Sequence, residues 1–253
     1  MDPAREIDEV VRVGLHRDPS LTLVDALVYC TIARFDPTLY VQLANMSGLN
    51  ERTARKSIRR LESAGWLRVE DASPRTRDSR VRFVLSAPHQ VQAAMAKIIR
   101  RRRSTAPRVG EYLMFVWLDL LVVSLAYQNN ARPRFLANPP TGYAMEVDRL
   151  YFDEKVAFEF QGRQHFEETD LHQSRDKFLA QQTRDLTKQA LCERAGVALV
   201  EITEEDLTYQ GMVRKAGSHL RLRRIDRDGE VVRILTQLCG EYVAAGTRAL
   251  RAR

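Results

Sequence analysis

The chain has 253 residues, of which 44% are apolar, and a formal net charge of +7; this length and composition suit two folded domains and exclude a disordered protein. It contains no run of about 18 apolar residues, and its N-terminus lacks the basic and apolar segments of a signal peptide, so we expect a cytoplasmic protein with no membrane partner. The three cysteines lie far apart with no CxxC pair, which argues against a disulfide framework and a structural zinc site. The positive charge, mostly arginine, favours a polyanionic partner.

The sequence divides into four regions by pattern. Residues 1–20 read as a polar leader with room for a short helix, and residues 21–86 alternate helices with two short strands. Residues 87–108 form a basic helical connector, with a helix predicted over residues 89–103. Residues 109–253 combine helices and strands. Because Pro107 stops a helix, we place the domain boundary near residues 104–108.

Apolar spacing, capping residues and turn glycines predict three helices over residues 23–35, 38–46 and 50–64, and two strands over residues 67–70 and 80–85. Asn50 is a good N-cap for the third helix. Ala54, Ile58 and Leu61 recur at helical spacing and face the core. Gly65 ends the helix, because a left-handed conformation is accessible to glycine.

The stretch from Leu43 to Leu67 resembles the helix-turn-helix of winged-helix transcription regulators. In such domains the third helix enters the major groove of double-stranded DNA, and the wing between the strands contacts the adjacent backbone. The resemblance implies a winged-helix DNA-binding domain at residues 21–86. The side chains expected to contact bases or phosphates are Arg52, Thr53, Arg55, Lys56, Arg59, Arg75, Arg77 and Arg80. The alternative is a winged helix that makes protein contacts or a dimer.

A second informative segment begins at Met145 and reads as strand, tight turn and strand. Val156, Phe158 and Phe160 alternate with Glu159 and Gln161. In a strand, successive side chains point to opposite faces, so the aromatic set marks a core face and the polar pair lies on the other.

If Asp153 and Glu154 form a two-residue turn, Asp148 lies directly opposite Glu159, and residue 146 opposite residue 161. Cβ atoms of directly opposed residues are about 5 Å apart, so two carboxylates there repel each other unless a cation lies between them. A divalent cation such as Mg²⁺ accepts one or two carboxylates together with substrate phosphate and water. Such a site suits metal-assisted phosphodiester hydrolysis.

Residues 110–207 resemble the PD-(D/E)XK, or restriction-endonuclease-like, nuclease superfamily, and are most similar to its branch related to very-short-patch repair endonucleases. The resemblance implies a restriction-endonuclease-like α/β domain over residues 109–253, with a mixed central sheet, and Mg²⁺ as cofactor, with Mn²⁺ able to substitute. It assigns the metal to Glu111, Asp148 and Glu159, and the third catalytic position to Gln161. For Glu111, at the start of an apolar helix, stabilisation of the helix dipole is the alternative role.

Gln161 replaces the usual lysine, which would orient the attacking water and stabilise the developing charge, and this puts catalysis in doubt. A helix expected over residues 176–195 carries a Gln-X-X-Arg-Asp-X-X-Lys motif that also resembles this branch. Its Lys188 could reach the phosphate as a catalytic group, or pair on the helix surface with Asp185 or Glu193. His165, in the Gly-X-X-His element after the second strand, is a catalytic base or a core imidazole.

These features predict a Mg²⁺-dependent DNA endonuclease, a hydrolase held on duplex DNA by a winged helix. A catalytically inactive nuclease fold that serves as a DNA-binding regulator is the second interpretation, supported by Gln161. The third is a replication or transposition protein that cuts only with a partner. Double-strand cutting normally needs two active sites, so a homodimer is a further expectation, and apolar C-terminal residues such as Val231 and Leu235 could form its interface or cover the sheet.

Overall fold

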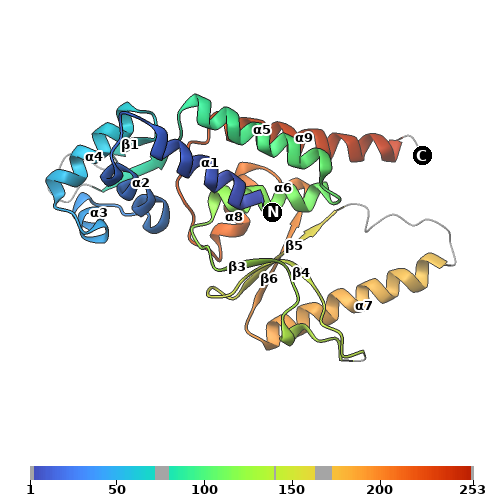
Figure 1. The fold of residues 1–253 in the computed structure, drawn as a ribbon. Helices are drawn as coiled ribbons and strands as arrows, with labels where there is room; N and C mark the ends of the chain where they lie inside the picture. Colours follow the sequence, from blue (N-terminus) through green and yellow to red (C-terminus); the bar gives the residue numbers. More distant parts are fainter. Residues whose placement is uncertain (1–2, 72–79, 140, 163–172, 252–253) are drawn as a thin grey trace. The chain divides into compact units, whose positions relative to one another are not determined.

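The structure is a computed structural model that describes residues 3–71, 80–139, 141–162 and 173–251 (Figure 1). The chain forms two compact units. The first combines residues 1–107, 116–123 and 221–238, and the second combines residues 108–115, 124–220 and 239–253. None of the described helices has the length and apolar character needed to cross a membrane.

The first unit contains the predicted winged helix. Its elements are α2 (Leu23–Phe35), α3 (Tyr40–Ser47), α4 (Glu51–Ser63), β1 (Leu67–Asp71) and β2 (Val81–Leu85). The two strands form an antiparallel hairpin in which Leu67 lies opposite Leu85. The order of elements is as predicted, and the bounds differ from the predicted ones by at most two residues.

Local signals explain why α4 forms where it does. The Asn50 side chain accepts a hydrogen bond from the Thr53 N–H at 2.8 Å and so caps the helix. Ala54, Ile58 and Leu61 are buried, as their spacing predicts. Gly65 follows the helix at φ 77°, in the left-handed region that favours glycine, and the chain then enters β1.

Residues 3–17, where the sequence left room for a short helix, form helix α1 (Pro3–Arg17), which packs against α5 (His89–Thr105). Ile7 and Leu15 of α1 are buried. A Cβ atom on Gly14 would lie only 2.9 Å from the Trp66 and Val91 side chains, so glycine permits this close approach. The few apolar residues of α1 give too weak a pattern to reveal this packing from sequence. The predicted connector helix is confirmed as α5.

Two later segments, residues 116–123 and 221–238, belong to the first unit, although we expected residues 109–253 to form one domain. Backbone pairing explains the return of the second segment. The Leu85 N–H donates to the Arg224 carbonyl at 2.7 Å, and the Asp226 N–H donates to the Leu85 carbonyl at 2.8 Å. Five of the C-terminal apolar residues, Val231, Val232, Ile234, Leu235 and Leu238, are buried within the chain, so they offer no exposed dimer interface.

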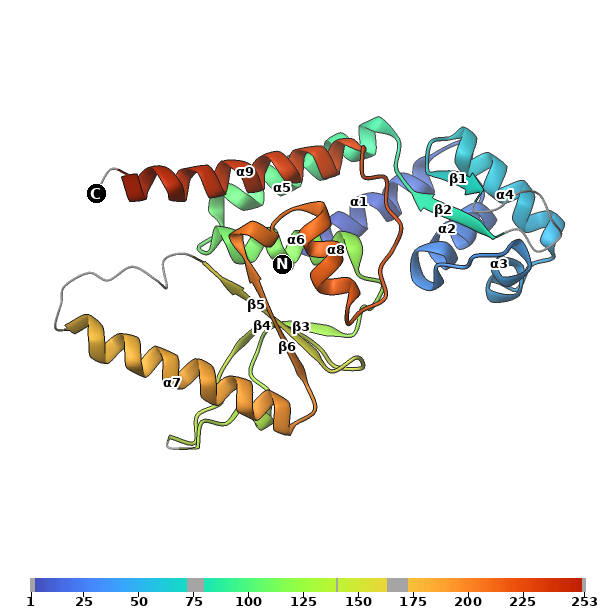
Figure 2. The ribbon, with the colours of Figure 1, turned by 180° about the vertical axis from the view of Figure 1, so that it is seen from behind.

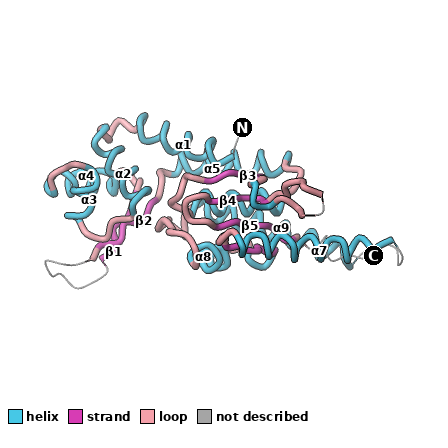
Figure 3. Tube along the Cα trace, turned by 90° about the horizontal axis from the view of Figure 1, so that it is seen from below, coloured by secondary structure: helices cyan, strands magenta, loops and turns pink. Residues whose placement is uncertain are grey.

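The second unit contains a four-stranded mixed sheet, as predicted (Figures 2 and 3). Its strands, in the order in which they pair, are β3 (Tyr127–Ala131), β4 (Val147–Tyr151), β5 (Val156–Gln161) and β6 (Ala198–Thr203). The β3–β4 and β4–β5 pairs are antiparallel, whereas β5 and β6 are parallel. A parallel pair needs a crossover, which α7 (Gln173–Arg194) provides.

The other helical elements of this unit lie before, between or after these strands in the sequence. They are α6 (Val109–Leu121), which contributes its first residues, η1 (Arg134–Leu136), η3 (Glu204–Asp206), α8 (Tyr209–Gly217) and α9 (Glu230–Arg251), which contributes its last residues. The apolar core joins the sheet to α7. Leu150 of β4 and Ala157 of β5 pack there with Leu191 and Cys192 of α7.

The predicted register of the β4–β5 hairpin is confirmed. Tyr151 pairs with Val156, Leu150 with Ala157 and Arg149 with Phe158. The turn spans residues 152–155 rather than two residues, and Lys155 adopts φ 54° there. The same register, continued by one residue, brings Asp148 opposite Glu159.

Candidate active site and nucleic-acid interface

The outward face of α4 carries the side chains predicted to bind DNA. Arg52, Arg55, Lys56 and Arg59 are exposed, whereas Thr53 is half-buried. Arg80, at the start of β2, is exposed as well. Arg75 and Arg77 lie outside the described residues. The structure therefore leaves a cationic helix face open to a ligand.

Arg55 differs from the other cations of this face because it has ionic and aromatic partners among the described residues. Its Nη2 lies 2.6 Å from Glu51 Oε1, and its guanidinium group lies 3.8 Å from the centre of the Tyr40 ring. The first contact runs along α4, and the second holds the Arg55 side chain against Tyr40 at the start of α3. The negative charge of Glu51 also offsets the positive charge of Arg55. The surplus positive charge of the face is therefore carried by Arg52, Lys56 and Arg59.

Arg60 of α4 points inward and forms a pair that the sequence did not reveal. Its Nη2 and Nε lie 2.6 and 2.8 Å from the two carboxylate oxygens of Asp25, which is 0% exposed. Burial acts to raise the pKa of Asp25, but hydrogen bonds from Arg60, Ser57 and Thr22 outweigh it and lower the pKa to about 2. The pair links α4 to α2 and so fixes the orientation of the cationic face.

Three predicted acids come close together in the second unit: Glu111 of α6, Asp148 of β4 and Glu159 of β5. We call them the carboxylate site. Asp148 lies two residues before Leu150 in β4, and Glu159 lies two residues after Ala157 in the antiparallel β5, so both extend the sheet face that α7 covers. Glu111 and Asp148 are each 9% exposed.

Lys188 of α7 lies buried at the carboxylate site, 6% exposed, and forms an ion pair with Glu159. It therefore pairs with neither Asp185 nor Glu193, the surface partners considered from sequence. The apolar Leu186 on the same helix is instead 66% exposed. Lys188 lies one turn before Leu191 and Cys192, on the face of α7 that packs against the sheet, and so reaches the strand that carries Gln161.

The backbone of β5 holds Asp148 in place. The Phe160 N–H donates to Asp148 Oδ2 at 2.7 Å. The Phe160 ring packs at 6.2 Å from the Tyr242 ring. A Cβ atom on Gly110 would lie 2.1 Å from this ring, so glycine lets the start of α6 approach it and place Glu111 beside Asp148. Gly110 and Tyr242 were missed because their contacts join distant parts of the sequence.

Arg108 is a second cation at the site that the sequence analysis missed. Its Nη1 lies 3.3 Å from Glu111 Oε2, and its side chain is 69% exposed. Glu146 lies outside β4 and pairs with Arg132 at 2.9 Å, so the predicted opposition of Glu146 and Gln161 is not part of the ladder. Gln161 ends β5 half-exposed. His165 lies outside the described residues.

Burial makes the carboxylate site a poor place for negative charge. Burial and the neighbouring Glu111 raise the pKa of Asp148 to about 6, against the hydrogen bond from Phe160. Burial also raises the pKa of Glu159 in spite of Lys188, and that of Glu111 in spite of Arg108. Such a site favours the binding of further positive charge.

We expect the Asp148→Asn substitution to stabilise the protein by about 3 kcal/mol at neutral pH. The pKa of Asp148 is about 6 in the folded state and 3.8 in model compounds, so the folded state binds the proton more tightly. Its stability therefore falls as pH rises through this interval, and the penalty persists above pH 6. Asparagine removes the charge, and its side-chain oxygen can still accept from the Phe160 N–H. Urea denaturation of both proteins at pH 7.5 and pH 4 tests this, and an equal difference at both pH values would contradict it.

The carboxylates of the site suit a metal ion whose remaining ligands come from substrate and water. Within the described residues, no group of three or more His, Cys, Asp or Glu side chains could by itself hold a metal ion. Mg²⁺ rarely needs such a cage, because one or two carboxylates suffice when phosphate and water supply the remaining oxygens. The buried oxygens of Asp148 and Glu159, at the end of the sheet face, are hard ligands of this kind.

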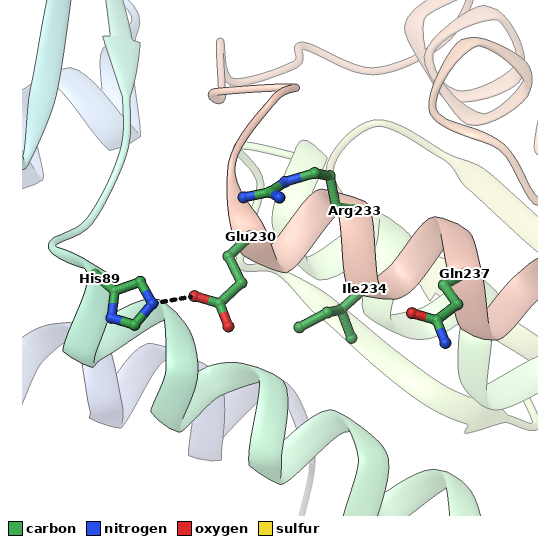
Figure 4. A pocket seen from close by; sticks show the side chains of 5 residues that line it. All are labelled: His89, Glu230, Arg233, Ile234 and Gln237. Atoms are coloured by element: carbon green, nitrogen blue, oxygen red, sulfur yellow. Dashed lines mark ion pairs between the residues drawn. The ribbon is translucent and has the colours of Figure 1, made fainter.

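A pocket in the first unit lies between α5 and α9 (Figure 4). It is lined by His89, Glu230, Arg233, Ile234 and Gln237. His89 Nε2 lies 3.3 Å from Glu230 Oε2, but the His89 side chain is 88% exposed. Surface ion pairs of this kind contribute little free energy, and we assign the pocket no function.

Comparison with family models supports the helix-turn-helix of the first unit, and two curated viral proteins match part of the chain. Residues 20–67 match the family model of a helix-turn-helix domain. The chain is 35% identical over 86 residues to Uncharacterized protein 094L of Frog virus 3 (isolate Goorha), which is 33% of this chain and 56% of that protein. It is 37% identical over 73 residues to Uncharacterized protein 033L of Invertebrate iridescent virus 3, which is 28% of this chain and 38% of that protein.

The chain thus spans about half, or less, of the length of these relatives. No solved structure matches it. The helix-turn-helix match indicates DNA as a partner, whereas none of the comparisons supports the nuclease resemblance, which stays a prediction.

Proposed function

We propose that the chain is a divalent-metal-dependent DNA endonuclease, in which the winged helix holds duplex DNA and the second unit hydrolyses a phosphodiester bond. The observation that carries the proposal is the position of Lys188. It lies buried beside Glu159, on the sheet face that also carries Asp148. A lysine delivered from α7 would compensate for Gln161, the departure from the nuclease pattern that most weakened the sequence argument.

The chemistry follows from the charges of these side chains. Asp148 and Glu159, with Glu111 beside them, would hold a Mg²⁺ or Mn²⁺ ion, which when bound activates water and stabilises negative charge on phosphate. Lys188 would place its ammonium group against the same phosphate or the attacking water. A fixed cation in a site with little water stabilises developing negative charge more strongly than it would in solution.

The winged helix would supply DNA affinity. We expect Lys56→Gln to weaken binding to every duplex sequence and to lower the slope of log affinity against log salt by about 1, because the variant releases one counter-ion fewer. Lys97→Gln is the matched control, since Lys97 is an exposed lysine on α5 of the same unit. Fluorescence anisotropy with labelled duplex over a salt series measures both. Equal slopes for Lys56→Gln and the unsubstituted protein would remove Lys56 from the interface.

A second candidate function is a DNA-binding regulator whose nuclease fold has lost catalysis. Two observations favour it. Gln161 stands where the nuclease pattern has lysine, and the described residues contain no complete three-ligand metal site.

The two candidates differ in strand scission. Supercoiled plasmid is incubated with the purified protein and Mg²⁺, Mn²⁺ or a chelator, and the products are separated on agarose. The endonuclease gives nicked or linear DNA with metal and none with chelator. Intact plasmid that the protein still binds, in both metals, would reject the enzyme acting alone and leave the regulator or an enzyme that needs a partner.

A further inference from the structure

Two cations among the described residues, Lys188 and Arg108, pair with acids of the carboxylate site, and they differ sharply in exposure. The Lys188 side chain is 7% exposed, whereas the Arg108 side chain is 69% exposed. Removal of Lys188 from Glu159 would leave a buried charge without its partner, which is strongly unfavourable. Arg108 makes one contact of 3.3 Å with Glu111 and can release it into water at little expense of free energy. Arg108 is therefore the cation that can exchange partners.

The charges at the site agree with such an exchange. The three acids of the carboxylate site carry three negative charges when ionised, and Lys188 and Arg108, the cations among the described residues that pair with them, carry two positive ones. Nearby Glu146 is already balanced by Arg132. A divalent cation would turn the remaining single negative charge into a single positive one. A phosphodiester group carries one negative charge, so the metal and one phosphate together would balance the charges of these five side chains.

We infer that Arg108 is an exchangeable counter-ion, an inference that rests on the proposed function. Arg108 pairs with Glu111 in the absence of metal, and it turns to a phosphate of the DNA backbone once a divalent cation binds at the carboxylate site. The guanidinium group suits this second role, because its fork can donate two hydrogen bonds to phosphate oxygens. The position of Arg108 suits it as well. Its carbonyl accepts from the Tyr112 N–H at 3.0 Å, so its backbone is fixed at the start of α6 while its side chain extends into solvent.

This exchange couples metal binding to DNA binding. Calorimetry of Mn²⁺ binding, with and without a short duplex whose phosphorothioate linkages resist hydrolysis, measures the coupling. We expect the duplex to raise the Mn²⁺ affinity of the unsubstituted protein at least about fivefold. Arg108→Gln should abolish this rise. Without duplex, Arg108→Gln should bind Mn²⁺ about twofold to fivefold more tightly than the unsubstituted protein, because the competing guanidinium group is gone.

Two further variants make the test specific. Arg132→Gln removes an arginine that is 68% exposed and also paired with a glutamate, and it should keep the rise. Arg108→Lys keeps the charge and should retain part of it. The inference fails, and the proposed function stands, if the duplex does not raise the Mn²⁺ affinity of the unsubstituted protein. The same conclusion follows if the duplex raises the affinity of Arg108→Gln by the same factor as that of the unsubstituted protein. If the unsubstituted protein binds no Mn²⁺ at all, the proposed function fails, and the inference with it.

Discussion

Lys188→Met is expected to lower the rate of metal-dependent plasmid cleavage by about 10²- to 10⁴-fold. The substitution keeps the length and the apolar stem of the side chain but removes the ammonium group that contacts Glu159. If Lys188 takes over the task of the missing lysine at position 161, no other cation among the described residues of the site replaces it, because Arg108 lies on the exposed side next to Glu111. Initial rates of supercoiled plasmid loss, at equal protein and Mn²⁺ concentrations, measure the effect.

Lys215→Met is the matched control for this experiment. Lys215 belongs to the same unit and also pairs with a buried carboxylate, that of Asp206, at 3.4 Å. Its loss should leave the cleavage rate within about twofold, as is usual for residues outside the chemical step. Thermal denaturation confirms that each variant folds. A folded Lys188→Met protein that cleaves at the unsubstituted rate would remove Lys188 from the mechanism.

The second large effect concerns the stability of the winged helix. Arg60→Met is expected to lower the free energy of unfolding by about 3–5 kcal/mol, because it leaves the fully buried Asp25 carboxylate without its ionic partner. Guanidinium denaturation followed by the fluorescence of Trp66, which is buried in the same unit, measures the change. Arg59→Met, one residue earlier on the exposed face of α4, should change stability by less than about 0.5 kcal/mol.

The same pair gives a pH dependence with a definite sign. The pKa of Asp25 is lowered from 3.8 to about 2 in the folded state, so its contribution to stability is complete above about pH 4 and is lost as pH falls toward 2. The unsubstituted protein should therefore lose stability over this interval faster than Arg60→Met does. Parallel stability curves for the two proteins between pH 5 and pH 2.5 would contradict this assignment.

Sequence analysis predicted most of the winged helix because the signals there are local. The Asn50 cap, the buried Ala54 and Leu61 and the turn at Gly65 lie within one helix and its ends. The β4–β5 register was predictable for a related reason. A short turn and the alternation of buried and polar residues leave few registers that bury the Phe158 ring.

The remaining features depend on contacts between distant parts of the chain. The apolar Leu186 is exposed and the charged Lys188 is buried, which reverses the usual preference, so helical spacing alone could not orient α7. The pairing of Leu85 with residues 224–226 joins segments about 140 residues apart and carries no local pattern. Arg108 was missed because an arginine three residues before a glutamate is common on helix surfaces.

The most direct test of the proposed endonuclease compares the unsubstituted protein with Asp148→Asn on supercoiled plasmid in Mn²⁺, with duplex retention measured in parallel. Asparagine can keep the hydrogen bond from the Phe160 N–H, so the comparison isolates the charge of Asp148 from the fold. We predict nicked or linear product from the unsubstituted protein, no product from Asp148→Asn, and equal duplex retention by both. Equal cleavage by the two proteins, or no cleavage by the unsubstituted protein, would contradict the assignment of the carboxylate site as a nuclease centre.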